Sequence, residues 1–434
     1  MQKNKKVINA WCMYDWANSV YSLTISSAVF PSYYQGIVAN NPQGLVDFFG
    51  WQVQSDSIYS YVLSAGFLIV ALISPILSGV ADYIGNKKPF MKVFVYLGAL
   101  SCIALYFFTS NNNIEFGLLA SMLAVVGFTG SIVFYNAYLP EIAPKEEHDK
   151  ISAKGFSYGY IGSVILLVIN LAMIMGHEML GITEALAARI SFIMVGVWWI
   201  AFSQITFAKM PKGVKKEKPK SLVANGFKQL ANVWKEFKSI VHLRRFVPAF
   251  FFFSVGVQTI IYLATIFGSA KPEDGGLGME TSQLIISILL IQIVAIGGAY
   301  LFAYLSKKFG NIKALSICVT VWMLVCGGAY FVIDANGFYI TALFVGLVMG
   351  GVQSLSRSTY AKMLPKTNDM ASYFSFYDVT EKISIVVGTL CFGLIVSLTG
   401  SMRNSILAIV AFFVVGLILL LRVKFAPNAS TTQF

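Results

Sequence analysis

Charged residues are scarce in this chain of 434 residues. Asp, Glu, Lys and Arg together make up 12% of the chain, where an ordinary soluble domain carries roughly 25%. Hydrophobic residues make up 57%. Because the outside of a soluble protein must be largely polar, so little charge excludes a soluble globular fold and predicts an integral, multi-pass membrane protein.

Cysteine and histidine are rare as well. The five cysteines form no CxxC pair and have no histidine at metal-ligand spacing, so we expect no disulfide framework, no metal site and no cofactor. An HExxH sequence is absent, which argues against a zinc-dependent enzyme within the membrane. The basic residues behind the net charge of +12 lie between apolar segments, so nucleic acid is not an expected partner.

Twelve stretches are long and apolar enough to cross a membrane as helices, since a span needs about 20 mostly apolar residues. The first stretch carries Asp15 and lacks a small-residue cleavage site, so we interpret it as a retained span and not as a signal peptide. The expected spans are 10–36, 57–81, 90–109, 115–138, 154–175, 189–208, 246–268, 282–305, 312–333, 338–361, 371–398 and 404–422. The predicted fold is therefore an all-α membrane protein.

Lysine and arginine alternate between the two sides of this predicted fold. With the N-terminus placed inside, the inner segments carry 28 basic residues and the outer segments carry 3. Basic residues concentrate in cytoplasmic loops, so both termini are expected in the cytoplasm. The absence of an organelle signal fits the inner (plasma) membrane of a bacterium, and we expect a monomer surrounded by membrane lipids.

A long basic connection divides the chain. Residues 209–245 begin with KMPKGVKKEKPK, which is typical of a solvated linker. Apolar residues then recur at three- and four-residue spacing, with lysines on the other face, at Leu222, Phe227, Leu230, Trp234, Phe237 and Val241. This spacing predicts an amphipathic helix in the inner headgroup layer, or a plain linker helix.

Weak internal repeats suggest that the two halves arose by duplication. DYIGNKK at 82–88 and KKFGNIK at 307–313 follow the second and eighth spans and share a Gly-Asn pair beside lysines. Internal repeats of this kind are common among transporters. We therefore expect two six-helix bundles, at 1–208 and 246–434, joined by the linker 209–245.

The turn between the second and third spans combines an acid, a glycine and two lysines. Gly85 permits a sharp turn, and Asp82 can accept hydrogen bonds from free N–H groups at a neighbouring helix start. A contact of this kind that forms in only one conformer would act as a latch. We interpret Asp82, Gly85, Lys87 and Lys88 as a gating element, with a purely topological charged turn as the alternative.

Several short motifs resemble one known family. They are WCMYDWANS at 11–19, FPSY at 30–33, FYNAYLPE at 134–141, GYIG at 159–162, GGVQSLSRS at 350–358 and YFSFY at 373–377. Together they cover nearly the whole chain in order, and they resemble the autophagy-related vacuolar amino-acid effluxer family, a branch of the major facilitator superfamily. The resemblance implies a twelve-helix transporter that rocks between inward-open and outward-open states, with amino acids as a substrate class.

Asp15 is a lone carboxylate in the first predicted span. A charge at membrane depth is costly and usually faces the bundle interior. Tyr14, Asn18 and Tyr21 flank it along the span. We interpret these residues as a substrate or proton site. The alternative is an inner-leaflet charge that reaches the headgroups or pairs with Arg357 or Lys154 as a closed-state gate.

The tenth and eleventh spans carry the other candidates. Gln353 and Arg357 lie near the inner end of the tenth span, where Arg357 either binds a carboxylate by a forked contact or acts as a gate. Asp378 and Lys382 are four residues apart and can pair on one helical face. Glu381 is then a spare acid that could carry a proton, because burial favours the neutral form of a carboxyl group. A structural ion cluster is the alternative.

The expected function is secondary active transport of small organic solutes, amino acids among them, with proton coupling as an option. A zwitterion would suit paired fixed charges of both signs. We hypothesise that five charged residues face one cavity in the inner half of the membrane: Asp15, Arg357, Asp378, Glu381 and Lys382. Tyr14, Asn18, Gln353 and Tyr377 would line this cavity. The alternative is a non-transporting or lipid-handling membrane protein of the same fold.

A cysteine placed in the linker tests the predicted orientation. In a background without the five native cysteines, Lys228→Cys should resist a membrane-impermeant maleimide added to intact cells and react once the cells are opened, because basic segments face the cytoplasm. Asn112→Cys, in a short outer segment, should react in intact cells. Labelling of Lys228→Cys from outside would contradict the topology.

Overall fold

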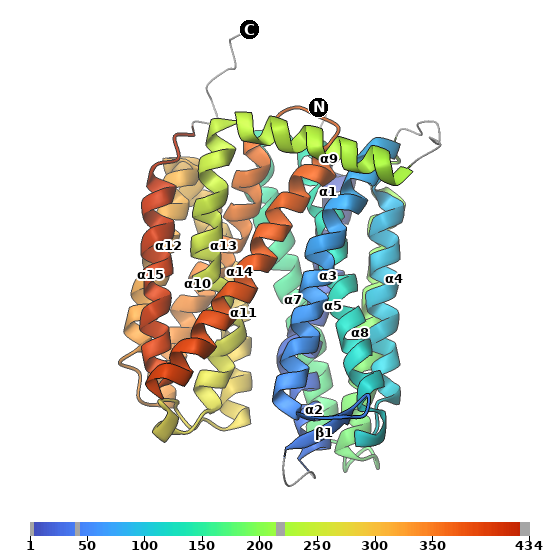
Figure 1. The fold of residues 1–434 in the computed structure, drawn as a ribbon, viewed down its shortest axis with the longest axis vertical. Coiled ribbons are helices and arrows are strands. Elements are labelled where there is room, and N and C mark those ends of the chain that lie inside the picture. Colours follow the sequence, from blue (N-terminus) through green and yellow to red (C-terminus); the bar gives the residue numbers. More distant parts are fainter. Residues whose placement is uncertain (1–3, 40–43, 214–221, 426–434) are drawn as a thin grey trace. The chain divides into compact units, whose positions relative to one another are not determined.

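The computed structural model describes residues 4–39, 44–213 and 222–425, and most of these residues are helical (Figure 1). The lysine-rich linker segment 214–221 and the tail 426–434 lie outside the described residues. Within the described part, eleven helices are long and apolar enough to cross a membrane. The predicted all-α membrane fold is confirmed, and each of these helices contains or closely overlaps one predicted span.

The helices have the following bounds: α1 Lys5–Val20, the π-helical η1 Tyr21–Ala28, α2 Val29–Val38, α3 Ser55–Ile84, α4 Lys88–Ala104, α5 Ile114–Asn136, α6 Leu139–Ile142, α7 His148–Met175, α8 Glu184–Lys209, α9 Leu222–Ser239, α10 Val241–Ser269, α11 Thr281–Phe309, α12 Asn311–Ala329, α13 Ala335–Met363, α14 Met370–Thr399 and α15 Met402–Leu421. Short 3₁₀ turns lie at Leu105–Phe107, Asn111–Asn113, Lys145–Glu147 and Pro272–Asp274.

The first predicted span, 10–36, is a helical run in three parts. α1 continues directly into the eight-residue π-helical segment η1, which continues into α2. π-helical turns widen the helix, are rare and occur often at functional sites. Apolar length alone predicts a helix here but not this change in winding.

Local chemistry explains why several helices extend past the apolar spans. Thr183 Oγ1 accepts a hydrogen bond from the Leu186 amide at 3.2 Å and so begins α8, and Asp334 Oδ1 accepts from the Gly337 amide at 2.9 Å at the start of α13. Side chains of this type satisfy amides that the helix leaves free. At the other end of α3, Gly85 adopts φ 73°, a left-handed conformation that ends a helix readily only at glycine.

A β-hairpin is the main element that the predicted fold lacks. Strands β1, Leu45–Phe48, and β2, Trp51–Gln54, pair antiparallel with Val46 opposite Val53. Phe49 and Gly50 connect them with φ of 53° and 83°, as a tight two-residue hairpin turn requires. The hairpin lies in a segment that we expected to be an outer loop.

The chain divides into two compact units, each built from separate stretches. The N unit consists of Lys5–Asn136 and Tyr158–Phe227, and the C unit consists of Met1–Asn4, Ala137–Ser157 and Lys228–Phe434. The stretch Ala137–Ser157 precedes the linker in sequence but packs within the C unit. The division of the sequence into two six-helix bundles, 1–208 and 246–434, joined by the linker 209–245, stays a prediction.

Helix pairing within each unit follows one pattern. In the N unit the contacting pairs include α1 with α8, α3 with α5, α4 with α5 and α4 with α8. In the C unit the pairs at equivalent places in the order of spans recur, as α10 with α15, α11 with α13, α12 with α13 and α12 with α15. This recurrence supports the internal duplication that the weak sequence repeats suggested.

Glycines bring α11 and α13 together backbone to backbone. A Cβ atom on Gly298 would overlap the backbone of Leu347, and one on Gly350 would overlap the backbone of Ala295. Small residues permit this approach, which replaces the hydrophobic driving force that helices lack in lipid. Gly350, in the predicted tenth span, and Gly298, in the eighth, therefore allow close helix packing.

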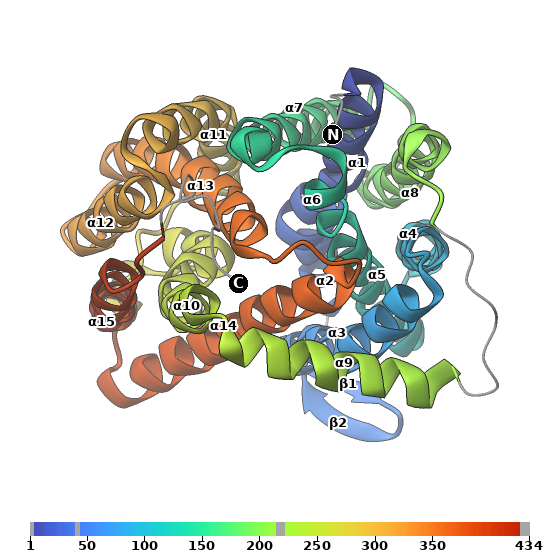
Figure 2. The same cartoon turned by 90° about the horizontal axis from the view of Figure 1, so that it is seen from above.

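The linker helix α9 is amphipathic, and its buried side is rotated from the predicted one. Val233 and Phe237 are buried, whereas Phe227 and Trp234 are 50% and 43% exposed. α9 crosses the end of α14, where the Phe237 and Trp234 rings contact Phe376 at 5.6 and 5.1 Å (Figure 2). Contact with protein explains the rotation, and the exposed aromatics remain on a surface that headgroups can cover.

Two neighbouring glycines of α11 provide a matched test of this packing. Gly298→Leu should lower the thermal unfolding midpoint of the purified protein by several degrees, because the new side chain meets the Leu347 backbone and overpacking costs about 1–3 kcal/mol. Gly297→Leu meets no atom within 4 Å and should leave the midpoint unchanged or higher. Equal midpoints for the two variants would contradict the proposed packing.

Candidate functional site

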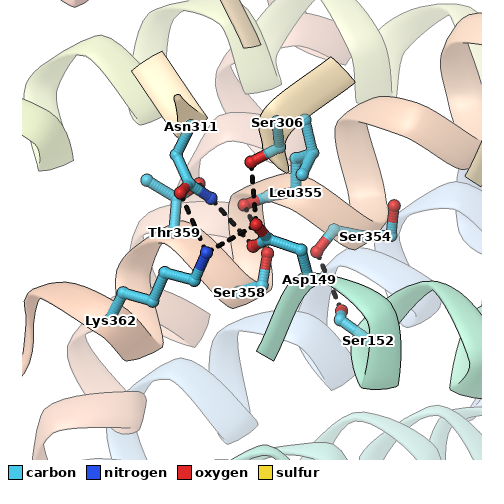
Figure 3. A network of polar contacts seen from close by, with 9 residues as sticks. All are labelled: Asp149, Ser152, Ser306, Asn311, Ser354, Leu355, Ser358, Thr359 and Lys362. Atoms are coloured by element: carbon cyan, nitrogen blue, oxygen red, sulfur yellow. Dashed lines mark hydrogen bonds and ion pairs between the residues drawn. The ribbon is translucent and has the colours of Figure 1, made fainter. Parts of the chain in front are cut away.

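A buried ion pair links α7 and α13 in the C unit (Figure 3). Lys362 Nζ on α13 lies 2.5 Å from Asp149 Oδ2 in the first turn of α7. The two residues are 5% and 6% exposed. Because charge without water needs a partner, each side chain holds the other in place.

Polar side chains from the junction of α11 and α12 complete the coordination of Asp149. Ser306 Oγ donates to Asp149 Oδ2 at 2.7 Å and Asn311 Nδ2 donates to Asp149 Oδ1 at 2.8 Å. Asn311 Oδ1 accepts from Lys362 Nζ at 2.9 Å. Asn311 Nδ2 also lies 3.1 Å from Thr359 Oγ1. We call Asp149, Ser306, Asn311, Thr359 and Lys362 the Asp149 network.

The Asp149 network was missed by sequence reasoning, although one signal pointed to it. Asn311 belongs to the repeat 307–313 that matches the predicted gating turn. Asp149 lies in a charged segment before the fifth span and Lys362 at the end of the tenth. Because 213 residues separate them along the chain, only the tertiary fold could show that they meet.

Arg357 lies one and a half helical turns before Lys362 and also reaches α7. Its Nε donates to Ser152 Oγ at 2.9 Å and its Nη2 donates to the Ser152 carbonyl at 3.0 Å. The guanidinium lies over the Phe156 ring at 4.1 Å, and Arg357 is 3% exposed. Ser152 Oγ in turn donates to the Ser354 carbonyl at 2.8 Å. These contacts tie α13 to α7, and the two roles predicted for Arg357, gate and carboxylate binder, stay predictions.

The charges of α14 form a second cluster, which we call the α14 cluster, with Asp378 and Lys382 buried and the Glu381 side chain 23% exposed. Lys382 Nζ lies 3.3 Å from Asp378 Oδ1 and 3.1 Å from Glu381 Oε2. Gln258 Nε2 on α10 donates to Glu381 Oε1 at 2.9 Å. The expected pairing of Asp378 with Lys382 is present. The expectation that Glu381 is a spare acid is wrong, because Lys382 is adjacent to it and Gln258 reaches it across the helix interface.

Aromatic rings enclose the start of α14. Tyr377 stacks on Phe250 of α10 with 4.3 Å between ring centroids and lies 5.1 Å from the Tyr360 ring of α13. Tyr377 is buried, and Gln353 on α13 is partly exposed. Tyr377 therefore joins α10, α13 and α14, while its predicted role in lining a cavity stays a prediction.

In the N unit, Asp15 is buried and accepts a hydrogen bond from the Tyr135 hydroxyl at 2.8 Å. Trp11 Nε1 donates to the Tyr135 carbonyl at 3.0 Å, and the two rings stack at 4.5 Å. Tyr14, Asn18 and Tyr21 are buried beside it on the same helical run. The sequence shows Tyr135 only as part of the FYNAYLPE motif, and its hydrogen bond to Asp15 becomes visible only in the structure.

Asp15 and the charges on α13 and α14 belong to different compact units. The hypothesis of one cavity shared by all of them stays a prediction.

Lys88 of the predicted gating turn has a structural contact within the N unit. Its Nζ donates to the Phe207 and Met210 carbonyls at 3.0 and 2.6 Å. A cation at these positions satisfies the free carbonyls at the end of α8. Asp82 and Lys87 are buried at 3% and 8% exposure. The latch hypothesis for Asp82, Gly85 and Lys87 stays a prediction.

Two other kinds of site find no support. GFSYG at 155–159 has the spacing of a hydrolase nucleophile motif, but Ser157 lies inside α7 and donates to the Ala153 carbonyl at 2.8 Å, whereas that motif requires a sharp strand-to-helix turn. Among residues 4–39, 44–213 and 222–425, no group of three or more His, Cys, Asp or Glu side chains could hold a metal ion.

Comparison with known proteins shows which family this chain is similar to. The family model described as "Vacuole effluxer Atg22 like" matches residues 3–430. An uncharacterized MFS-type transporter of Bacillus subtilis, YxiO, is 32% identical over 100% of this chain and 97% of its own length. Autophagy-related protein 22 of Kluyveromyces lactis is 25% identical over 85% of this chain and 79% of its own.

Solved structures with little sequence identity share the fold. The major facilitator superfamily transporter FucP, in its outward conformation, aligns with a TM-score of 0.70 at 14% identity, covering 97% of this chain and 98% of that one. The human organic anion transporter MFSD10 aligns with a TM-score of 0.74 at 11% identity, covering 97% and 100%.

Removing the charge of Lys362 tests the Asp149 network. Lys362→Met should destabilise the protein by about 3–5 kcal/mol, because it leaves a buried carboxylate without its cation. The double variant Asp149→Asn with Lys362→Met should recover much of this loss, since Asn keeps an acceptor for Ser306. Thermal unfolding of the purified protein measures both effects, with the exposed Lys366→Met as control. Additive losses in the double variant would contradict a direct ion pair.

Proposed function

The chain belongs to the family described as vacuole effluxer Atg22 like, a branch of the major facilitator superfamily of transporters, and from this premise we propose that it moves zwitterionic solutes, amino acids in particular, in exchange with or together with protons. It is an integral, multi-pass membrane transporter and not an enzyme. The substrate class, the coupling and the membrane belong to the proposal.

The α14 cluster is the observation that carries the proposal. Ionisable residues inside membrane helices are costly and mark substrate or proton pathways by default. Lys382 offers a cation, and Asp378 and Glu381 offer carboxylates within 3.3 Å of it. An amino acid carries both charges, so its carboxylate suits Lys382 and its ammonium suits a carboxylate. Asp15 is a second candidate partner for the ammonium.

The Asp149 network is the proposed inner gate. Asp149 precedes the fifth span, whereas Ser306, Asn311 and Lys362 belong to the eighth to tenth spans. Alternating access requires contacts between the two halves of the sequence that form in one state and break in the other. A buried ion pair with neutral hydrogen-bond donors is either closed, with every charge paired, or open, with every charge hydrated. A half-open state is costly because it leaves a charge without a partner and without water.

Arg357 belongs to the same proposed gate. Its guanidinium holds Ser152 and Phe156, which lie within two turns of Asp149 on α7. Breaking the Asp149 network without releasing Arg357 would leave α7 tied to α13, so both contacts must open together. The proposed membrane is the bacterial plasma membrane, with both termini in the cytoplasm.

Ligand screening and flux measurements test the transport proposal. Among amino acids, short peptides and sugars, an amino acid should raise the thermal unfolding midpoint and exchange across proteoliposome membranes. Lys382→Met should reduce that flux by at least about tenfold, which corresponds to the loss of about 1.4 kcal/mol of binding. Lys366→Met, at an exposed position, should retain it.

A well-folded protein that neither binds nor exchanges any amino acid would contradict the proposal. Transfer of a fluorescent phospholipid between leaflets by that same preparation would favour the lipid-handling alternative instead. The thermal unfolding midpoint of Lys382→Met without ligand separates a lost binding group from a misfolded protein.

A further inference from the structure

Asp378 is a buried carboxylate whose hydrogen-bonding capacity is not used. It is 1% exposed, and neither Oδ1 nor Oδ2 accepts a hydrogen bond from any residue in the described part of the chain. Lys382 Nζ approaches Oδ1 to 3.3 Å, close enough for attraction between the charges. An ionised carboxylate offers about four acceptor sites, so a buried one without a donor is unusual and points to a further occupant.

Glu381 differs from Asp378 in this respect. It accepts from Gln258 Nε2 at 2.9 Å and from Lys382 Nζ at 3.1 Å. Hydrogen bonds donated to a carboxylate stabilise its charged form. The negative charge of the cluster therefore resides on Glu381, and Asp378 is the acid that gains most from being neutral.

The α14 cluster contains one more acid than base. Two acids face one lysine, and the phenols of Tyr262 on α10 and Tyr377 on α14 lie near them. The charge of Arg357 on α13 also acts on Tyr377, while its guanidinium contacts Ser152 and Phe156. A buried charge without a hydrogen bond is costly, so Asp378 favours uptake of one positive charge.

A proton is the occupant that best fits Asp378 itself. A metal ion would need several oxygen ligands and would be repelled by the ammonium of Lys382. A proton needs one oxygen and no additional space.

We propose that Asp378 is the residue of α14 that binds and releases a proton during the transport cycle. This inference rests on the proposed proton coupling and names its carrier. A proton from water on the open side forms a bond to a carboxylate oxygen of Asp378, and the cluster changes from one net negative charge to neutral. Lys382 then pairs with Glu381 alone. On the other side the O–H bond breaks, the proton returns to water and Lys382 is shared again.

Infrared difference spectroscopy of the reconstituted protein, with no substrate added, tests the inference. Exposed carboxyl groups remain ionised between about pH 9 and about pH 6. A carboxylic acid C=O band that appears in this interval and shifts in D₂O should therefore report a buried acid. We expect the band in the natural protein, its loss in Asp378→Asn and its retention in Asp15→Asn, which removes a buried acid of the N unit.

Asp378→Glu keeps the test decisive if Asp378→Asn does not fold, because the band should then move in frequency and not vanish. The inference is overturned if the natural protein has no such band, or if the band survives unshifted in both Asp378 variants.

Flux measurements separate this inference from the proposed function. If the band depends on Asp378 but amino-acid flux ignores a pH gradient, the proton site stands and the proposed coupling fails. If flux follows the pH gradient equally in the natural protein and in Asp378→Asn, the coupling stands and Asp378 is not its carrier.

Discussion

Asp149 and Lys362 hold opposite charges together at 2.5 Å where almost no water reaches either side chain. Neither charge is stable there alone, so the pair dictates where α7 and α13 meet, and Ser306 and Asn311 add the turn between α11 and α12. Removing one partner from such a pair costs about 3–5 kcal/mol. The same requirement accounts for the other buried charges, since Arg357 is held by Ser152 and Lys382 lies between two acids.

Close helix packing determines which charges can find partners. In lipid, helices associate through small residues and polar contacts and not through hydrophobicity. Gly350 lets α13 approach α11 until their backbones touch, which places Lys362 beside Ser306 and Asn311 at the helix ends. Gly388 does the same for α14 and α10, and this approach puts Gln258 within hydrogen-bonding distance of Glu381. Glycine positions and buried polar contacts are thus parts of one arrangement.

The two polar clusters have different chemistry and so suit different tasks. The Asp149 network pairs one acid with one base, and its carboxylate accepts three hydrogen bonds, which favours a contact that is either intact or open. The α14 cluster has more acids than bases, and its Asp378 carboxylate accepts no hydrogen bond within the described residues, which favours exchange of a small cation with the surroundings. α13 ends in the first cluster, and Tyr360 of α13 contacts Tyr377 of α14 next to the second. A change at either cluster can therefore reach the other through one helix interface.

The sequence by itself determined the membrane class, the positions of the spans and the family, because apolar length, basic loops and ordered motifs are local properties of the chain. The pairing of Asp378 with Lys382 was also predictable, since residues four apart share a helical face. Only the tertiary structure decided that Glu381 has a partner on another helix, because Gln258 is 123 residues away. It also decided that Asp149 meets Lys362 and that Ala137–Ser157 packs with helices that follow the linker. The strength of a buried charge contact depends on which distant helix supplies the donor, and no local pattern records that.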